Sequence, residues 1–427
     1  MEAKQLKVSK YPWVVCVLLV LFMFAGIGLS NTTYGTHLPY LIEKYGMTNT
    51  QSSLQASFRS FASLATLAIL VPSFKKLKIK HVAVTAFAAG VIGWGVLAYA
   101  PDYKWLYAGN IFLGICFAAA GMTTVTAFIR NWFVAHRGLI AGIITAGTGL
   151  CGTVVPPLQR ALIDALGVSG CFLVEGTVAL VTLVLIILFI KDTPEEMGIY
   201  PLGGEKAPRV VEGEDNFVEN SKYAAKPISH VLICIFLVCL GAFNYNAWGH
   251  LSLLYTNAGW DAAQVATLLA FAGFVLIVTK TLYGLLSDKL PVNKTAWLFY
   301  GTCLAAMLMW WKLAGVKSMP LQFVIFTVYG IGGVLCTTGI SVYAMDLSNS
   351  SNCKTIAAIY LLTYNLGSMA TAPIIGKIAD LSGGDYGPAY LFMGACCVVG
   401  YICTMIAYKL AEDNAKKKAA AEPAEEK

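Results

Sequence analysis

The strongest constraint on this chain is a series of apolar windows, each about twenty residues long. A helix of that length spans the hydrocarbon core of a bilayer, where a helix also satisfies its own backbone hydrogen bonds. Charged residues make up only 12% of the chain, and its mean hydropathy is +0.68. Soluble proteins carry about a quarter of charged residues. The sequence therefore predicts an all-α integral membrane protein.

We identify twelve such windows, and each predicts a transmembrane helix. A polar stretch rich in Pro, Gly and acidic residues follows the sixth window and is typical of a linker. The predicted organisation is an N-terminal six-helix half at 1–190, a linker at 191–226, a C-terminal six-helix half at 227–410 and a tail at 411–427. The expected spans are 11–43, 50–72, 80–100, 104–130, 138–164, 168–190, 227–256, 261–287, 293–313, 319–345, 355–379 and 386–409.

The basic residues predict the orientation. If the spans alternate in direction, most of the 30 Lys and Arg residues fall on the side that holds both termini and the linker. Cytoplasmic loops carry such an excess, so both termini are predicted to be cytoplasmic. The same bias explains the net charge of +7, and nucleic acid is not an expected partner. We expect a monomeric, multi-pass protein of the cell inner membrane, with the lipid bilayer as its surroundings.

The two halves share sequence features at a constant offset. His37-Leu38 and His250-Leu251 are 213 positions apart, and so are Gly46 and Gly259. The same offset relates two helix-capping patterns, Thr48 with Gln51 and Asp261 with Gln264. A parallel duplication of this kind predicts a pseudo-symmetric transporter with its site between the halves at mid-membrane.

The sequence lacks the motifs that are typical of metal sites, nucleotide binding and hydrolytic enzymes. Most of the twelve cysteines lie inside apolar runs, at spacings that fit neither a zinc site nor a disulfide framework. We find no P-loop, which argues against ATP-driven transport, and no nucleophile elbow. The first apolar window is too long for the core of a signal peptide, so we expect it to be retained. The chain is predicted to be no enzyme and to need neither cofactor nor metal.

Two cations lie well inside the predicted spans. Lys280 sits in an apolar run about 12 Å from Asp288 at the charged end of that span. A buried cation is costly in hydrocarbon and marks a candidate functional site, although pairing with an acid or carbonyl on another helix is the alternative. Arg59 has polar neighbours, which suggests a wet helix face. It could face the translocation path, act as a gate or helix-pairing charge, or snorkel.

Polar residues interrupt the first helix of each half at about the same depth. We expect hydrogen bonds to substrate from Tyr34, Asn244, Asn246, Tyr364 and Asn365, or, alternatively, bonds between helices.

The remaining titratable groups are candidates for gating or coupling. His37 and His250 are expected near the outer mouth and titrate near neutral pH. Glu175 is a candidate for proton coupling or for a structural pair with Arg160. Asp288 and Asp346 are expected in salt bridges at the cytoplasmic helix ends.

Gly284, Ser287, Asp288 and Lys289 form the pattern G-x-x-x-D-(K/R) after the eighth span, whereas the first-half copy, VPSFKKLKIKH, lacks the Gly and Asp. This pattern is similar to the loop motif of the major facilitator superfamily, which the chain resembles over nearly its whole length. Two further stretches resemble the branch of monocarboxylate transporters and oxalate–formate antiporters. They are RNWFVAHRGLIAGIITAGTGLCGTVVPP, at 130–157, and DTPEEMGIYPLGG, at 192–204.

This resemblance implies that the cation of the eighth helix, here Lys280, meets the substrate carboxylate. Oxalate carriers of the branch have a second cation in the eleventh helix, where this chain has Tyr364 and Asn365. Lys also lacks the two-pronged geometry with which Arg holds a carboxylate. Both differences favour a substrate with a single carboxylate.

The predicted function is secondary active transport of a small organic anion by alternating access. The expected cargo is a monocarboxylate such as lactate, pyruvate or formate, moved by proton symport or by anion exchange. Alternatives are larger aromatic or bile-type acids, or a dicarboxylate such as oxalate exchanged for a monocarboxylate. A membrane sensor would need a soluble output segment, and a cation or drug exporter would need intramembrane acids in its cavity.

Overall fold

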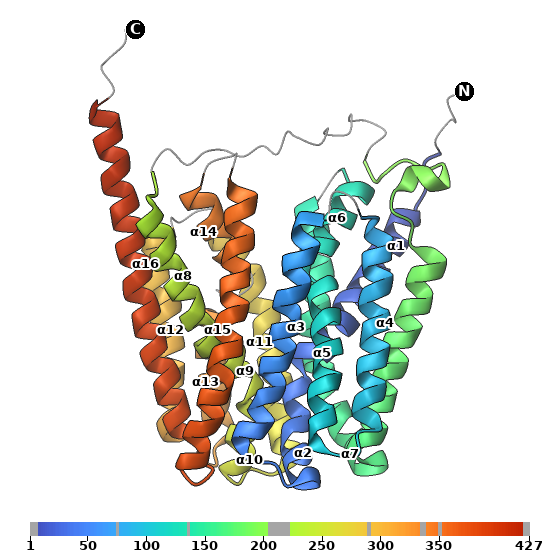
Figure 1. Ribbon diagram of the computed structural model, residues 1–427, viewed down its shortest axis with the longest axis vertical. Helices are drawn as coiled ribbons and strands as arrows, with labels where there is room; N and C mark the ends of the chain where they lie inside the picture. Colours follow the sequence, from blue (N-terminus) through green and yellow to red (C-terminus); the bar gives the residue numbers. More distant parts are fainter. Residues whose placement is uncertain are drawn as a thin grey trace, which may run out of the picture.

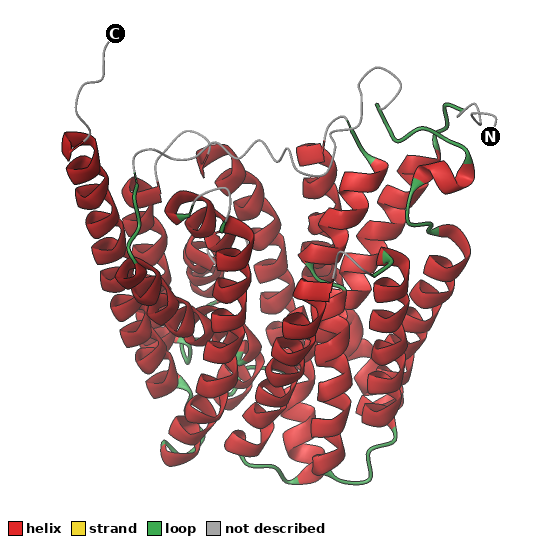
Figure 2. Cartoon of the chain, turned by 45° about the horizontal axis from the view of Figure 1, so that its top comes forward, coloured by secondary structure: helices red, strands yellow, loops and turns green. Residues whose placement is uncertain are grey.

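A computed structural model describes residues 7–73, 77–134, 137–203, 223–287, 292–333, 339–348 and 352–421. Side chains are described in these ranges except at 137–138, 280–287, 292–296, 339, 341, 345, 354 and 418–421. The described chain is helical between its loops, as the apolar windows predict (Figure 2). Two isolated parallel bridges, Lys7 with Ile199 and Phe133 with Leu202, hold the segment at 199–202 against N-terminal residues.

The N-terminal group contains ten helical elements, and most of their buried residues are apolar. They are α1 (Tyr11–Met23), η1 (Phe24–Thr32), η2 (Tyr34–His37), α2 (Leu38–Tyr45), α3 (Asn49–Ser73), α4 (Ile79–Ala98), α5 (Tyr103–Ala119), α6 (Met122–Trp132), α7 (Arg137–Phe189) and η3 (Pro194–Met197).

The C-terminal group begins after the linker and contains the remaining elements. They are α8 (Pro227–Leu240), η4 (Gly241–Asn246), α9 (Ala247–Gly249), α10 (Leu251–Asn257), α11 (Ala262–Ser287), α12 (Val292–Leu313), α13 (Met319–Gly333), α14 (Gly339–Leu347), α15 (Cys353–Leu381) and α16 (Gly387–Ala421).

Nine helices in the described part of the chain are long and apolar enough to cross a membrane. The predicted spans 138–164 and 168–190 both lie in α7, which breaks at Gly167. Gly167 has a φ of 69°, which glycine adopts without the steric cost that a side chain would bring. The chain can therefore reverse direction there, as two separate spans require.

The first helix of each group contains a π-helical stretch. These stretches are η1, Phe24–Thr32, and η4, Gly241–Asn246. A π-helical turn redirects the side chains that follow it and is frequent at functional sites. Their matching places support the internal duplication that the sequence predicts.

The two groups lie side by side and approach each other at the end that carries α2 and α10 (Figure 1). The start of α1 and the end of α16 lie at the other end (Figure 1). A Cβ added to Gly273 of α11 would lie 2.3 Å from the carbonyl carbon of Gly152 in α7. Glycine is thus required where these helices cross, because any side chain would push the backbones apart.

Candidate functional site

Arg59 is a buried cation on α3 with 4% of its surface exposed. Its Nε donates to the hydroxyl of Tyr245 at 3.3 Å, and its Nη1 donates to Asn110 Oδ1 at 3.0 Å. The guanidinium carbon lies 4.6 Å from the centre of the Tyr34 ring. Among the described side chains, no carboxylate lies within 4.0 Å of the guanidinium. The hydrogen-bonding partners of Arg59 that the structure describes are therefore neutral.

Neutral hydrogen-bonding groups surround this charge. Tyr34 donates to Gln55 Oε1 at 2.6 Å, and Asn110 Nδ2 donates to the Tyr34 hydroxyl at 2.7 Å. The Gln55 amide nitrogen is buried and has no hydrogen-bond partner in the described part of the chain. It is a free donor one helical turn from Arg59, where an anion could accept its hydrogen bond. We call Tyr34, Gln55, Arg59, Asn110 and Tyr245 the Arg59 cluster.

A series of hydrogen bonds joins α3 to the C-terminal group and ends beside the Arg59 cluster. We call this series the seal. Four residues on one face of α3 make these bonds: Thr50, Ser53, Ser57 and Ser60. Their partners, in the same order, are Asp380, His250, the Met369 carbonyl and Ser368. At 1.5 Å per residue the series covers about 15 Å of α3. Arg59 thus sits about midway along the helix, where the seal between the groups ends.

His37 lies in a second buried cluster beside the first, rather than at an outer mouth. Its Nε2 lies 3.1 and 3.2 Å from the two carboxylate oxygens of Glu175. Gln159 donates to Glu175 Oε1 at 2.6 Å and to Thr33 Oγ1 at 3.2 Å. All three side chains are at most 3% exposed. The centre of the His37 ring is 5.8 Å from that of Tyr34, so the two clusters are in contact.

The expected pair between Glu175 and Arg160 is wrong. Arg160 instead binds Asp164 at 3.0 Å and reaches Asp261 of the C-terminal group at 3.8 Å. Arg160 lies where α7 is open to solvent, whereas Glu175 points into the buried interior of its group. The sequence could not reveal this, because it depends on how the two arms of α7 fold back on one another.

Donor atoms of His37, Cys171 and Glu175 lie within 4.8 Å of one another, a distance that a metal ion could bridge. The surrounding chemistry does not suit a cation. Gln159 directs an N–H donor at the carboxylate, and the Cys171 thiol donates to the Gln159 carbonyl at 3.9 Å. We interpret the cluster as a hydrogen-bonded carboxyl site.

Residues that the sequence predicted to contact substrate in the C-terminal group mostly join helices together. Asn244 donates to the Gly333 carbonyl at 2.9 Å, and Asn246 donates to Ser368 and Thr371. Asn365 donates to a carbonyl of its own helix and keeps a buried oxygen without a partner. Tyr364 is 8% exposed, and its ring centre lies 6.2 Å from that of Tyr245. Tyr364 thus borders the Arg59 cluster, and the asparagines pack behind it.

The expected gating residues occupy different places. His250 is buried and joins the seal, with Nδ1 2.7 Å from the Asn246 carbonyl. Asp346 accepts a hydrogen bond from Tyr408 at 2.9 Å. Asp288 lies outside the described residues. Lys280 lies on α11, but its side chain is also outside them.

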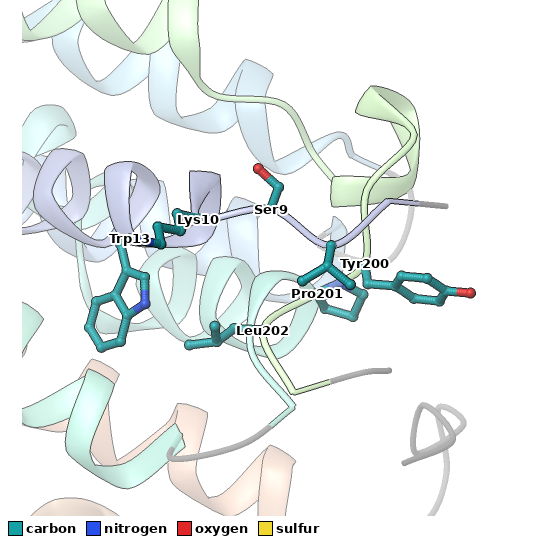
Figure 3. Close-up of a pocket in the computed structure, with 7 residues that line it drawn as sticks. Ser9, Lys10, Trp13, Tyr200, Pro201 and Leu202 are labelled. Atoms are coloured by element: carbon teal, nitrogen blue, oxygen red, sulfur yellow. The ribbon is translucent and has the colours of Figure 1, made fainter. Parts of the chain in front are cut away.

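A pocket of about 330 Å³ lies at the surface beside the start of α1 (Figure 3). Lys10 and Trp13 line it together with Tyr200, Pro201 and Leu202. Trp and Lys are common where a membrane protein meets the headgroup region. None of its lining residues belongs to the Arg59 cluster.

Sequence reasoning noted Gln55 only as one of the polar neighbours of Arg59, and it missed Asn110, Gln159, Tyr245 and Asp380. Helical spacing offered a signal for Gln55, which lies one turn from Arg59 on the same face. Tyr245 stands between Asn244 and Asn246, both of which were singled out. Asn110 and Gln159 interrupt apolar runs. Asp380 directly follows a predicted span. Acidic residues are common at the ends of spans, so its position alone did not indicate a role.

Comparison with known proteins identifies the family of this chain. A model of the Major Facilitator Superfamily matches residues 18–372 and 231–427. A relative from Agrobacterium vitis, named for tartrate transport, is 25% identical over 77% of this chain and 78% of its own. A Cupriavidus necator protein named for sulfoacetate transport is 24% identical over 91% of this chain and 92% of its own. Sugar phosphate exchanger 3 of Mus musculus is 24% identical over 71% of this chain and 68% of its own.

Solved structures share the fold at low sequence identity. A point mutant of the nucleoside transporter NupG has a TM-score of 0.69 at 14% identity, covering 92% of this chain and all of its own. A bacterial homologue of the human lysosomal transporter Spinster, solved in an inward-facing and unoccupied conformation, has a TM-score of 0.67 at 14% identity. It covers 98% of this chain and 100% of its own.

Proposed function

Since the chain belongs to the Major Facilitator Superfamily and is a secondary transporter, we propose that it carries a small organic anion bound at Arg59. The observation that carries this proposal is the burial of Arg59 without a described carboxylate partner. A buried charge without a counter-ion is costly, and an anionic ligand removes that cost. The guanidinium also offers the planar geometry that matches a carboxylate.

The position of Arg59 fits alternating access. The seal along α3 ends beside it, so a ligand there would lie against the contacts that hold one end closed. Tyr245 brings the C-terminal group to the same guanidinium at 3.3 Å. Groups from both sides of the moving interface would then sense whether an anion is present. We propose that a bound anion allows the N-terminal and C-terminal groups of helices to separate at the closed end and to close at the opposite end.

A monocarboxylate such as lactate, pyruvate or formate is the first candidate for the cargo, following the resemblance of 130–157 to the monocarboxylate branch. In this proposal Lys280 supplies a second positive charge from the C-terminal group. We further propose that the basic end with both termini faces the cytoplasm.

A hydroxy-dicarboxylate of the tartrate kind is the second candidate. The specific observation in its favour is the set of neutral donors and acceptors around Arg59, which suits hydroxyl groups on the substrate. Relatives named for tartrate and sulfoacetate transport support an anion with two polar ends.

Competition for exchange tests the proposal and separates these candidates. Purified protein in liposomes preloaded with L-lactate, L-tartrate, sulfoacetate, glucose 6-phosphate or uncharged D-glucose is offered the same labelled compound outside. We expect exchange with lactate or tartrate and none with D-glucose. Exchange of D-glucose, or exchange of neither lactate nor tartrate, would refute the proposed cargo.

A further inference from the structure

The cluster of His37, Gln159 and Glu175 offers a second site, distinct from the anion site. Glu175 is 3% exposed, and no described Lys or Arg lies within 4.0 Å of it. His37 and Gln159 hold it by hydrogen bonds, and aromatic rings of Phe172 and Trp94 enclose the imidazole. We propose that Glu175 binds the proton that accompanies the anion, an inference that rests on the proposed anion transport.

The hydrogen bonds around Glu175 suit both of its protonation states. The Gln159 amide nitrogen donates to the carboxylate at 2.6 Å, while its oxygen is buried without a partner. Rotation of this amide would bring its oxygen to the same place, where it would accept the O–H of a protonated Glu175. The cluster can therefore exchange one proton and keep the carboxyl group hydrogen-bonded.

His37 holds the proton on the carboxyl group rather than on its own ring. Its Nε2 faces Glu175, but its Nδ1 is buried without a partner. An imidazolium needs acceptors for both N–H groups, so a second proton on this ring would leave an unsatisfied buried donor. A neutral imidazole avoids that unsatisfied donor, and its Nε2 lies within hydrogen-bond distance of both Glu175 and the Gln159 amide nitrogen, at 3.1 Å from each.

Other titratable groups near the pair are few. On α7 they are the thiols of Cys171 and Cys151, and on η2 the phenol of Tyr34. On α4 the facing side chain is the non-titrating Trp94. On α3 the charged group is Arg59, which contacts the Tyr34 ring, and Tyr34 in turn lies beside His37.

Charge balance couples the two sites. When both are empty, a carboxylate at Glu175 can offset only part of the Arg59 charge, because Tyr34 lies between Arg59 and His37. A monoanion that pairs directly with Arg59 leaves the carboxylate of Glu175 as an unpaired negative charge, and a proton on Glu175 neutralises it. Lys280, whose side chain lies outside the described residues, is not counted in this balance. Because a net charge is costly in a low-dielectric interior, the anion and the proton bind together. The predicted cargo is one proton with each monoanion.

Infrared difference spectroscopy tests the proton site without any substrate. We acidify the reconstituted protein from about pH 8 to about pH 5 and record the C=O stretch of protonated carboxyl groups. We expect a band that Glu175→Gln removes and that Asp164→Asn, which alters an exposed carboxylate on the same helix, retains. A band that persists in Glu175→Gln, or its absence from the native protein, would overturn the proton site.

A second measurement tests the coupling. At fixed pH, an anion that exchanges in the competition panel should increase the Glu175 band, and Arg59→Gln should abolish that increase. A band that does not respond to an exchanging anion would overturn the coupling. If no anion exchanges while the Glu175 band is present, the proposed cargo fails but the proton site stands.

Discussion

Asp380, at the end of α15, caps the first turn of α3 in the opposite half of the molecule. Its carboxylate accepts hydrogen bonds from the backbone nitrogens of Asn49 at 2.9 Å and Thr50 at 3.0 Å. These amides belong to the unsatisfied donors of a helix N-terminus, and the negative charge also matches the helix dipole. The cap exists only while this end is closed, since its two parts belong to different groups.

Asp380→Asn should weaken the closed end. The substitution removes the charge and one acceptor oxygen, and charge-assisted hydrogen bonds contribute about 1.5–3 kcal/mol. We expect the population of the closed end to fall about tenfold, as measured by the distance between spin labels at the exposed positions Glu43 and Thr256. The control is Asp385→Asn, because Asp385 caps Gly387 within its own half. An equal change in both variants would contradict the role of Asp380.

Gly35→Ala should also open this end. A Cβ on Gly35 would lie 2.6 Å from the Gly249 carbonyl oxygen, so the two backbones would have to separate. Overpacking of this kind costs about 1–3 kcal/mol, and we expect exchange to slow at least fivefold. Gly249→Ala is the matched control, since its Cβ would meet nothing within 4 Å. Equal exchange rates in the two variants would contradict the proposed close packing at Gly35.

Tyr245→Phe should weaken anion binding without abolishing it. The variant loses the hydroxyl that accepts from Arg59 at 3.3 Å, and one neutral hydrogen bond contributes about 1 kcal/mol. We expect about a fivefold loss of affinity for the exchanging anion, measured by competition. The control is Tyr99→Phe, which removes a hydroxyl from an exposed residue. Unchanged affinity in Tyr245→Phe would argue that the hydroxyl does not position Arg59.

Lys280→Gln should abolish net uptake while leaving the protein folded. A point charge on the C-terminal half would be needed to hold the anion as the halves move. Uptake into liposomes measures the effect, and elution as a single species shows that the fold is intact. Near-native uptake would show that Lys280 does not bind the anion, and Arg59 would remain the proposed binding residue.

Much of the fold could be predicted because the bilayer constrains it so strongly. Windows of about twenty apolar residues predict helices, and glycine at 167 marks the turn inside α7. The offset between His37 and His250 predicted an internal duplication but not the two π-helical stretches, which only the structure shows.

The site was less predictable, because buried polar partners come from distant helices. The mid-span position of Arg59 was evident, but its contact with Tyr245, 186 positions away, depends on how the halves pack. For the same reason Glu175 was assigned to Arg160 rather than to His37, which is 138 positions away. Sequence spacing identifies neighbours on one helix and says little about the facing one.

The most direct test of the central claim is exchange of a labelled anion by Arg59→Gln. The matched control is Lys104→Gln, which removes an exposed cation from α5. For the anion that the native protein exchanges, Arg59→Gln should lose exchange at least a hundredfold, in line with the 3–5 kcal/mol lost when a buried ion pair is broken. Lys104→Gln should match the native rate. A native rate in Arg59→Gln would contradict the account.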